Sequence, residues 1–370
     1  MKVNVSKDEL MKGLQMVVPI IGTKITLPVL SNFLFATENG QIKLASTDLE
    51  TGIVGYIKGE IIEEGAITIP AKKFSEIIKE IPEENVEIKT EGYSINIKTK
   101  KSKFTLTGID QREYPKMQEY DKDNVITLNT KSLVSMFQKT LFAVSKDMQR
   151  FVLTGVYMVI DNGKMEMVAT DGKRLAYTSI DGMDTNIKGS AVLPTKAIND
   201  LSKIISLNSS ITNIKMNLAD NLATFIINDI VFQTRLIEGT FPNYKQVMPG
   251  KDLLTIKLNV QETLMAVKQA ALFTTNLLSG STGAIKMLFN NNKAIVSAQS
   301  SSSGSGEIEI DVEYSGEPAT ILFNPNYVKD VLQNIEEENA ILSYKSVTSP
   351  MNFSPEKSNN YVCVVMPMKE

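Results

Sequence analysis

Apolar and polar positions follow one pattern three times along the chain, over residues 67–81, 191–205 and 321–335. Each copy begins with a short apolar run, passes through a proline, and continues with apolar residues at the spacing of one helix face. The proline suits the first turn of a helix, where its missing N–H leaves no hydrogen bond unmade. The pattern therefore predicts a strand followed by an amphipathic helix in each copy. An acidic residue stands at the same position of the three helices: Glu76, Asp200 and Asp330.

A second amphipathic helix repeats in the same register, over residues 5–18, 128–141 and 258–271. The copies open with residues that favour the N-cap of a helix, namely Ser6, Asn129 and Asn259. An acid follows the first and third of these caps three residues later, as in a capping box. Two elements that recur together predict three copies of one domain rather than a solenoid of short repeats.

Strand patterns occupy most of the chain outside these helices, as stretches in which apolar and polar residues alternate. Two polar stretches that contain proline, residues 112–124 and 241–252, are expected to be linkers. We therefore expect an α+β protein of three tandem similar domains, each with two helices packed on antiparallel sheets. The expected domains are residues 1–122, 123–251 and 252–370.

Composition indicates an ordinary globular protein, since 42% of the 370 residues are apolar and 22% are charged. The single cysteine, Cys363, excludes an intrachain disulfide and fits a reducing cytoplasm. The first residues lack the apolar run of a signal peptide, and no stretch is apolar for long enough to span a bilayer. We therefore expect a cytoplasmic protein that does not contact a membrane.

The residue types limit the chemistry. The chain has no histidine, which excludes histidine-based acid–base catalysis, Ser–His and Cys–His nucleophiles, and ordinary zinc sites. Neither of the glycine-rich motifs that hold phosphates, G-x-x-x-x-G-K-S/T and G-x-G-x-x-G, occurs. The serine-rich stretch around Gly304 is expected to be a low-complexity loop and lacks the spacing of a nucleophile elbow. We therefore expect no metal, no cofactor and no catalytic residue.

The charge is unevenly distributed, although the net charge is only −3. The predicted helices together carry a net positive charge, so the excess of acid lies in the rest of the chain. Basic helix faces of this kind are commonly no more than solvated surface. Alternatively, lysines without interleaved aromatic residues and with few arginines suit loose contact with phosphates rather than the reading of bases.

Four stretches resemble one protein family closely: TLPVLSN at residues 26–32, ATDGKRLA at 169–176, FPNYKQVMP at 241–249 and VVMPM at 364–368. Together they resemble the β subunit of bacterial DNA polymerase III, the DNA sliding clamp family, and the resemblance covers the whole chain. It implies a head-to-tail homodimer ring of the DNA clamp fold, with helices lining the hole and double-stranded DNA passing through it. It further implies a processivity factor without catalysis of its own. Its implied partners are the replicative DNA polymerase, other DNA enzymes with a clamp motif, and a clamp loader that opens the ring with ATP.

The resemblance also assigns residues to a DNA-facing surface and to a dimer interface. The lysines expected to face DNA are Lys24, Lys131, Lys139, Lys196 and Lys203. At the interface, Phe104 and Leu106 are expected to point outward from an edge strand and to meet Leu272 and Phe273 at the end of a helix. Serines at residues 300–305 stand where the family often carries acids, so we expect a weaker ionic component.

The third implied surface is a pocket between the second and third domains that receives a short peptide motif of partner proteins. Leu, Val and Met side chains would form an adaptable apolar groove with Arg174 as a cation at its edge. The chain departs from the family at Lys173, at Gln246 and at its last residues, Lys369 and Glu370. The residues that match the family's pocket are Leu153, Thr170, Gly172, Arg174, Leu175, Pro242, Val247, Tyr327, Val347, Ser349, Val364, Val365, Met366, Pro367 and Met368.

Two other classes of function are left as alternatives by the sequence. A carboxylate-based or substrate-assisted enzyme on a three-domain β-rich scaffold would need two or three acids in one cleft, whereas Asp48 and Asp171 are equivalent in the repeat and are expected at turns. A monomeric adhesion or carbohydrate-binding array would be expected to have a signal peptide and more than 7% aromatic residues.

Overall fold

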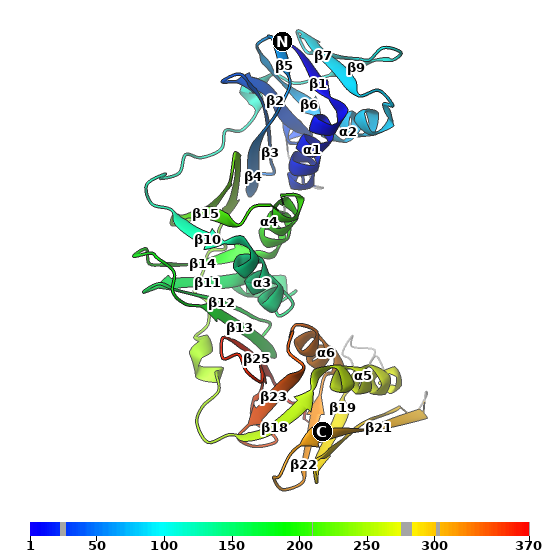
Figure 1. Cartoon of the computed structure of the whole chain (residues 1–370), viewed down its shortest axis with the longest axis vertical. Helices are drawn as coiled ribbons and strands as arrows, with labels where there is room; N and C mark the ends of the chain where they lie inside the picture. The colour runs from blue at the N-terminus through cyan, green and yellow to red at the C-terminus, as the bar shows by residue number, and fades with distance from the viewer. Residues whose placement is uncertain (23–26, 209, 275–282, 301–303, 370) are drawn as a thin grey trace. The chain divides into compact units, whose positions relative to one another are not determined.

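The computed structural model describes residues 1–22, 27–208, 210–274, 283–300 and 304–369 of the chain (Figure 1). The chain forms two compact units. The first comprises residues 1–131 and 196–236, and the second comprises residues 132–195 and 237–370. The second sequence repeat is therefore divided between the two units.

Six α-helices lie in the described part of the chain, and they coincide with the helices predicted from the apolar spacing. Pro325 occupies the first position of its helix as predicted, whereas Pro70 and Pro194 end a strand immediately before the helix begins. The bounds are α1 Lys7–Val17, α2 Ala71–Glu80, α3 Thr130–Leu141, α4 Thr195–Leu207, α5 Val260–Ala270 and α6 Pro325–Gln333.

The predicted N-caps determine where α1 and α5 begin. The Ser6 hydroxyl accepts a hydrogen bond from the Glu9 N–H at 3.3 Å, and the Asn259 side chain caps α5 in the same way. The second half of the predicted capping box does not form in α1. Instead, the Glu9 carboxylate accepts a hydrogen bond from the Lys58 N–H and pairs with Lys12 at 2.8 Å.

The first unit contains two antiparallel sheets. One has the order β5 (Glu60–Glu63), β1 (Lys2–Ser6), β7 (Asn85–Glu91), β8 (Ser94–Lys98) and β9 (Lys103–Thr107). The other has the order β10 (Ile126–Asn129), β15 (Asn213–Leu218), β16 (Leu222–Ile227), β17 (Ile230–Arg235), β4 (Thr51–Ile57), β3 (Gln41–Thr47), β2 (Asn32–Glu38) and β6 (Ala66–Pro70). Helices α1 and α2 lie side by side (Figure 1), and the Phe74 ring of α2 packs edge-on against Phe33 in the core, with centroids 5.5 Å apart.

The second unit contains one 12-stranded antiparallel sheet. Helices α5 and α6 lie side by side against the part of this sheet that the third repeat forms (Figure 1). The strand order of this sheet is β14 (Gly189–Pro194), β11 (Gly155–Asp161), β12 (Lys164–Thr170), β13 (Arg174–Ile180), β25 (Tyr361–Val365), β24 (Met351–Pro355), β23 (Asn339–Tyr344), β18 (Leu254–Asn259), β21 (Gly304–Glu313), β20 (Lys293–Ser300), β19 (Ile285–Asn290) and β22 (Ala319–Phe323).

The repeats share their sheets. In the first unit β17 of the second repeat pairs with β4 of the first repeat, and in the second unit β25 of the third repeat pairs with β13 of the second. Strands β4 and β13 are equivalent, because each follows a turn that begins at the repeated aspartate, Asp48 or Asp171. One pairing, used twice, therefore joins successive repeats.

The prediction for β9 is confirmed in one respect and wrong in another. The strand lies at the edge of its sheet, as expected. Its side chains Phe104 and Leu106, however, stand opposite the fully buried Ile97 and Ile95. Because opposed residues of an antiparallel pair share a face, both lie half-buried on the inner face, and the polar residues between them point outward.

The expectation of a loop around Gly304 is also wrong where the structure describes this stretch. Strands β20 and β21 remain paired up to Ser300 and Gly304, because extended backbone hydrogen bonds do not require apolar side chains. Lys24 lies outside the described residues. None of the described helices is both long and apolar enough to cross a membrane.

Candidate functional site

A cavity of about 290 Å³ opens in the second unit where segments distant in sequence meet. They are the turn between β12 and β13, the linker that follows β17, the end of β25 and a short stretch around Leu153. The cavity is mostly apolar. Its lining residues are Arg150, Leu153, Thr170, Gly172, Lys173, Arg174, Leu175, Phe241, Pro242, Asn243, Tyr244, Val247, Val364 and Met366.

The turn between β12 and β13 is built by local hydrogen bonds of polar side chains. The Asp171 carboxylate accepts from the N–H groups of Lys173 at 2.9 Å and Arg174 at 3.0 Å. The Thr170 hydroxyl accepts from the Gly172 N–H at 3.0 Å. Gly172 has φ +84°, a left-handed conformation that favours glycine. This turn places Arg174 and Leu175 in the lining of the cavity.

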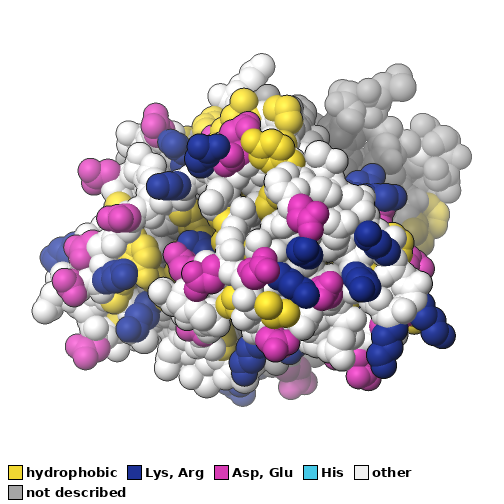
Figure 2. All heavy atoms as spheres, turned by 90° about the horizontal axis from the view of Figure 1, so that it is seen from above, with side chains coloured by type: hydrophobic (Ala, Val, Ile, Leu, Met, Phe, Trp, Pro, Cys, Tyr) yellow, Lys and Arg dark blue, Asp and Glu magenta, His cyan; other side chains and the backbone are white. Residues whose placement is uncertain are grey.

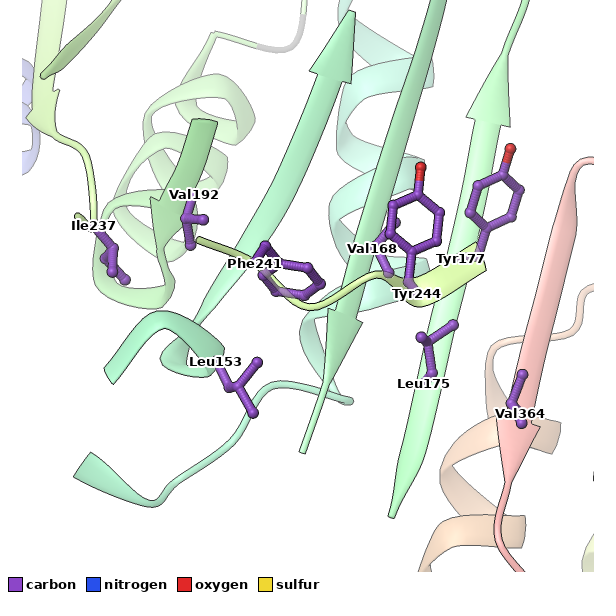
Figure 3. Packing of buried hydrophobic residues seen from close by; sticks show 9 residues of the cluster. All are labelled: Leu153, Val168, Leu175, Tyr177, Val192, Ile237, Phe241, Tyr244 and Val364. Atoms are coloured by element: carbon purple, nitrogen blue, oxygen red, sulfur yellow. The ribbon is translucent and has the colours of Figure 1, made fainter. Parts of the chain in front are cut away.

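The floor of the cavity is part of a hydrophobic cluster (Figure 3). Leu175 of β13 stands opposite Val364 of β25 in the sheet, so the pairing that joins two repeats also brings these side chains together. Leu153 and Phe241 belong to the same cluster and reach it from outside the sheet. An apolar side chain that entered this cavity would therefore contact residues of both repeats.

The linker wall of the cavity rests on aromatic side chains. The Phe241 ring stacks on Tyr157, with centroids 4.7 Å apart and planes 10° apart. The Tyr244 ring stacks on Tyr177 with centroids 6.1 Å apart, and in Figure 3 both hydroxyls point to the same side. Both hydroxyls donate to the carboxylate of Glu166, from Tyr244 at 2.6 Å and from Tyr177 at 2.7 Å.

Glu166 is ionised at neutral pH. Burial by itself would raise the pKa of this carboxyl, but the hydrogen bonds from Tyr244, Tyr177 and Lys164 outweigh burial and lower the pKa to about 2. Burial and the Glu166 charge raise the pKa of Tyr244, so its hydroxyl stays protonated. The linker is thus tied to β12 by a hydrogen bond to a charged acceptor, which is stronger than one between neutral groups.

Arg174 lines the cavity, but its charge is bound within the protein. Its side chain is 11% exposed, and its guanidinium donates to Asp171, to Asp330 of α6 and to the Phe142 carbonyl. Its charge is therefore neutralised within the protein. The exposed cations that line the cavity are Lys173 and Arg150.

The structure brings many of the predicted pocket residues together, and leaves others outside this cavity. Those that line it are Leu153, Thr170, Gly172, Arg174, Leu175, Pro242, Val247, Val364 and Met366. Those that do not are Tyr327, Val347, Ser349, Val365, Pro367 and Met368.

The residues outside the cavity have identifiable places. Tyr327 lies 4.6 Å from the Arg174 guanidinium and lines a neighbouring polar cleft. Val365 is fully buried and pairs with Arg174. Val347 and Ser349 belong to the turn after β23, where the Ser349 hydroxyl accepts from the N–H of Ser346. The Met368 N–H donates to the Leu322 carbonyl, and Pro367 between it and β25 is half-buried.

Five residues that line the cavity were not assigned to the pocket from the sequence, although Lys173 was named there as a departure from the family. Lys173 lies in the quoted motif ATDGKRLA, and Phe241, Asn243 and Tyr244 lie in FPNYKQVMP, so the motifs themselves could have suggested them. Arg150 has no sequence signal, because a 3-10 turn over Met148–Thr154 brings it to the cavity.

The lysines predicted to face DNA differ in how closely acidic side chains of the protein approach them. Lys196 pairs with Asp48 and Asp200, each at 3.0 Å. Lys139 lies 3.9 Å from Glu336. Lys203 is 65% exposed and lies 3.6 Å from the buried Asp200 carboxylate. Lys131 is exposed. On the face drawn in Figure 2, basic and acidic side chains are interspersed.

The residues predicted for the dimer interface lie at two sheet edges. Leu272 is 76% exposed in the 3-10 turn Ala271–Phe273 after α5. The Phe273 ring packs directly on Gly306 of β21. A β-carbon at Gly306 would lie only 2.6 Å from the ring, so a larger residue would not fit there without a shift. β21 pairs with β18 only through its last residues, so among the strands that the structure describes its first part is paired with β20 alone.

The charges at these edges are opposite. Along β21 the exposed residues include Glu307, Glu309 and Asp311. At β9 and the turn before it, the exposed residues include Lys101 and Lys103. Each edge thus carries half-buried apolar residues and exposed charges of one sign, of which Glu309 is already paired with Lys293 of β20.

Known proteins resemble the chain over its whole length. Family models of the DNA polymerase III beta subunit match in three parts: the N-terminal domain at residues 1–118, the central domain at 127–243 and the C-terminal domain at 245–369. The beta sliding clamp of Chlamydia pneumoniae is 30% identical over 371 residues, which cover 100% of this chain and 99% of that protein. The beta sliding clamp of Escherichia coli K12 is 27% identical and both chains are covered fully. The crystal structure of the DNA polymerase III subunit beta from Pseudomonas aeruginosa superposes with a TM-score of 0.93 at 28% identity, with 100% of both chains covered.

Proposed function

The chain belongs to the DNA polymerase III beta subunit family, and on that premise we propose how it works as a DNA sliding clamp. It has three tandem clamp domains, and it is a processivity factor that encircles double-stranded DNA and tethers the replicative DNA polymerase and other DNA enzymes. We place the domains at residues 1–122, 123–251 and 252–370, and the protein in the cytoplasm. It supplies no catalysis of its own to the polymerase holoenzyme.

The observation that carries this proposal is the apolar cavity at the junction of the second and third repeats. Apolar residues from β13, β25 and the linker converge there, as expected of a site for a short peptide with Leu or Phe anchors. Few anchors fit in about 290 Å³, so the affinity should be modest, on the order of micromolar. Modest affinity lets the polymerase, the clamp loader and other partners exchange on one clamp.

The proposed peptide site is larger than the cavity. Tyr327, Val347, Ser349, Pro367 and Met368 would extend it beyond the rim. Val365 is fully buried, and its proposed part is to hold β25 against β13 from below.

The ring is proposed to form from two chains arranged head to tail. Strand β9 of one copy would meet the free part of β21 of the other, a pairing that satisfies unpaired backbone groups on both edges. The apolar contacts would join Phe104 and Leu106 to Leu272 and Phe273. The opposite charges of the two edges support this pairing and would supply an ionic component that the serines at residues 300–305 lack.

DNA is proposed to be held loosely. Lys24, Lys131, Lys139, Lys196 and Lys203 would face it and contact phosphates through screened charges. The internal ion pairs of Lys139, Lys196 and Lys203 reduce the field that these three residues add. Retention on DNA would then come from the closed ring rather than from affinity.

Two experiments test the proposal. A fluorescent peptide with a Gln and Leu and Phe anchors should bind the protein with a Kd on the order of micromolar. The protein, loaded with a clamp loader and ATP on nicked circular DNA, should remain bound until the circle is cut and then slide off. Release from intact circles at the same rate as from linear DNA would contradict encirclement.

The carboxylate enzyme is not favoured by the structure. In both Asp48 and Asp171, one carboxylate oxygen accepts hydrogen bonds from backbone N–H groups of the residue's own turn. Both aspartates therefore stabilise turns, which is the structural role that their equivalent positions in the repeat predict.

A further inference from the structure

A half-buried acid lies beneath the linker wall of the cavity without lining the cavity itself. The side chain of Glu166 on β12 is 14% exposed. One oxygen accepts from the Tyr244 hydroxyl at 2.6 Å, and the other from Tyr177 at 2.7 Å and from Lys164 at 2.9 Å. Glu166 thus joins the linker to β12 and β13 through two tyrosines.

The two tyrosines differ in how firmly their own backbone is held. Tyr177 is fixed in β13, whose backbone pairs with β12 on one side and with β25 on the other. Tyr244 is the first residue of a 3-10 turn, Tyr244–Val247, and both ends of that turn line the cavity. Its hydrogen bond to Glu166 therefore acts on a segment that has no sheet partner of its own among the described strands.

We infer that Glu166 is a positioning residue for the peptide site, because through Tyr244 it fixes the linker wall that Pro242 and Val247 present to the cavity. This inference rests on the proposed function of that site. A pocket whose wall is held in place before binding avoids the entropy of ordering that wall when the peptide arrives. Phe241 on Tyr157 would hold only the near end of the linker, and Tyr244 on Glu166 would hold the end that carries Val247.

The test compares Tyr244→Phe and Glu166→Gln with a matched control, Tyr177→Phe. Each Tyr→Phe change removes one hydroxyl from the same carboxylate and leaves the ring in place. Titration of the fluorescent peptide into the full-length protein should give a Kd about tenfold weaker for Tyr244→Phe and for Glu166→Gln, the size expected for loss of a hydrogen bond to a charged group. Tyr177→Phe should change the Kd by less than about twofold, because backbone pairing keeps its strand in place.

Coupling and pH provide readouts that a general loss of stability would not reproduce. The double variant Glu166→Gln with Tyr244→Phe should bind no more weakly than the weaker single variant, since both changes act on the linker through the same Tyr244–Glu166 hydrogen bond. The wild-type Kd should stay constant between about pH 5 and 8, because the pKa of Glu166 is about 2 and its carboxylate stays ionised. Wild-type affinity in Tyr244→Phe, or an equal loss in Tyr177→Phe, would overturn the inference.

Amide hydrogen exchange separates this inference from the proposed function. Residues 241–249 should exchange faster in Tyr244→Phe and Glu166→Gln than in wild type or Tyr177→Phe. If the wild-type protein failed to bind the peptide, the proposed function of the site would be wrong. Unchanged exchange of the linker in both variants would overturn the positioning by Glu166, whether or not the peptide binds.

Discussion

The guanidinium of Arg174 on β13 donates a hydrogen bond to the carboxylate of Asp330 on α6. The same group donates to Asp171 at 3.1 Å and to the Phe142 carbonyl at 2.6 Å, and it lies 4.6 Å from the centre of the Tyr327 ring. Arg174 is therefore an internal link between a strand of the second repeat and a helix of the third. Arg174 nevertheless lines the cavity.

Replacement of Arg174 by Ala should lower the free energy of unfolding of the second unit by about 2 kcal/mol. The change leaves the Phe142 carbonyl and Asp330 without their donor, and the 36% exposure of Asp330 keeps the loss below that of a fully buried pair. Arg174→Lys should not restore stability, because an ammonium cannot reach Asp171, Asp330 and Phe142 with one planar fork. Urea denaturation followed by circular dichroism would measure the loss.

The matched control is Arg112→Ala. Arg112 pairs with Asp110 at 2.6 Å but is 84% exposed, and exposed ion pairs contribute little to stability. Its unfolding curve should nearly overlay that of the wild type. Equal losses from the two substitutions would contradict the internal role of Arg174.

The repeated acid illustrates what the sequence could and could not predict. Apolar spacing predicted the helices that carry Glu76, Asp200 and Asp330, because helix periodicity is a local property. The partners of these acids are set by tertiary contacts. Asp200 is buried against Lys196, Asp330 reaches Arg174, and Glu76 stays exposed beside Lys73. A local pattern has no information about them.

The presence of a cavity at this particular junction of repeats was likewise beyond the sequence pattern alone. At the equivalent junction in the first unit, Gly52 stands where β13 has Leu175. The Met117 side chain lies there, 3.4 Å from the position of a β-carbon at Gly52. Met117 of the first linker, residues 112–124, thus fills this position in the first unit. The equivalent position beside Leu175 in the second unit is part of the cavity. The motif around Leu175 pointed to a pocket only through the family resemblance.

The proposed dimer predicts that Leu272→Ala with Phe273→Ala gives monomers at micromolar concentration. The two side chains would lose their contacts with Phe104 and Leu106 of the other copy, and large apolar side chains dominate interface energies. Light scattering should then give the chain mass of 40.9 kDa, whereas the wild type should give twice that mass.

A surface control for this experiment is Leu254→Ala. Leu254 is also an exposed leucine, 48% exposed at the start of β18, and it lies outside the proposed interface. This variant should remain a dimer. A dimer in the double variant, or a monomer in the control, would count against the proposed contact.

The proposed DNA surface predicts that replacement of Lys24, Lys131, Lys139, Lys196 and Lys203 by Gln slows loading and weakens binding to DNA at low salt. Each phosphate contact that is lost should reduce the slope of log affinity against log salt by about one. Because Lys196 pairs with two carboxylates at 3.0 Å whereas Lys131 is exposed, Lys131→Gln should account for more of the loss than Lys196→Gln. Binding to DNA cellulose over a salt series would measure both variants. Unchanged binding in the fivefold variant would show that DNA lies elsewhere.

The C-terminal residues after β25 provide the sharpest test of the pocket. Deletion of residues 366–370 removes Met366 from the cavity but keeps Val364 and Val365, which pair with Leu175 and Arg174 and hold the sheet together. We expect at least about a tenfold loss of peptide affinity, because a removed anchor contact in a small apolar pocket dominates binding. Met366→Ala should give a smaller loss in the same direction. Met265→Ala, which truncates a more exposed methionine on α5, should give none. The dimer mass should not change, since β9 and β21 are untouched. Wild-type peptide affinity in the truncated protein would place the partner site outside this cavity.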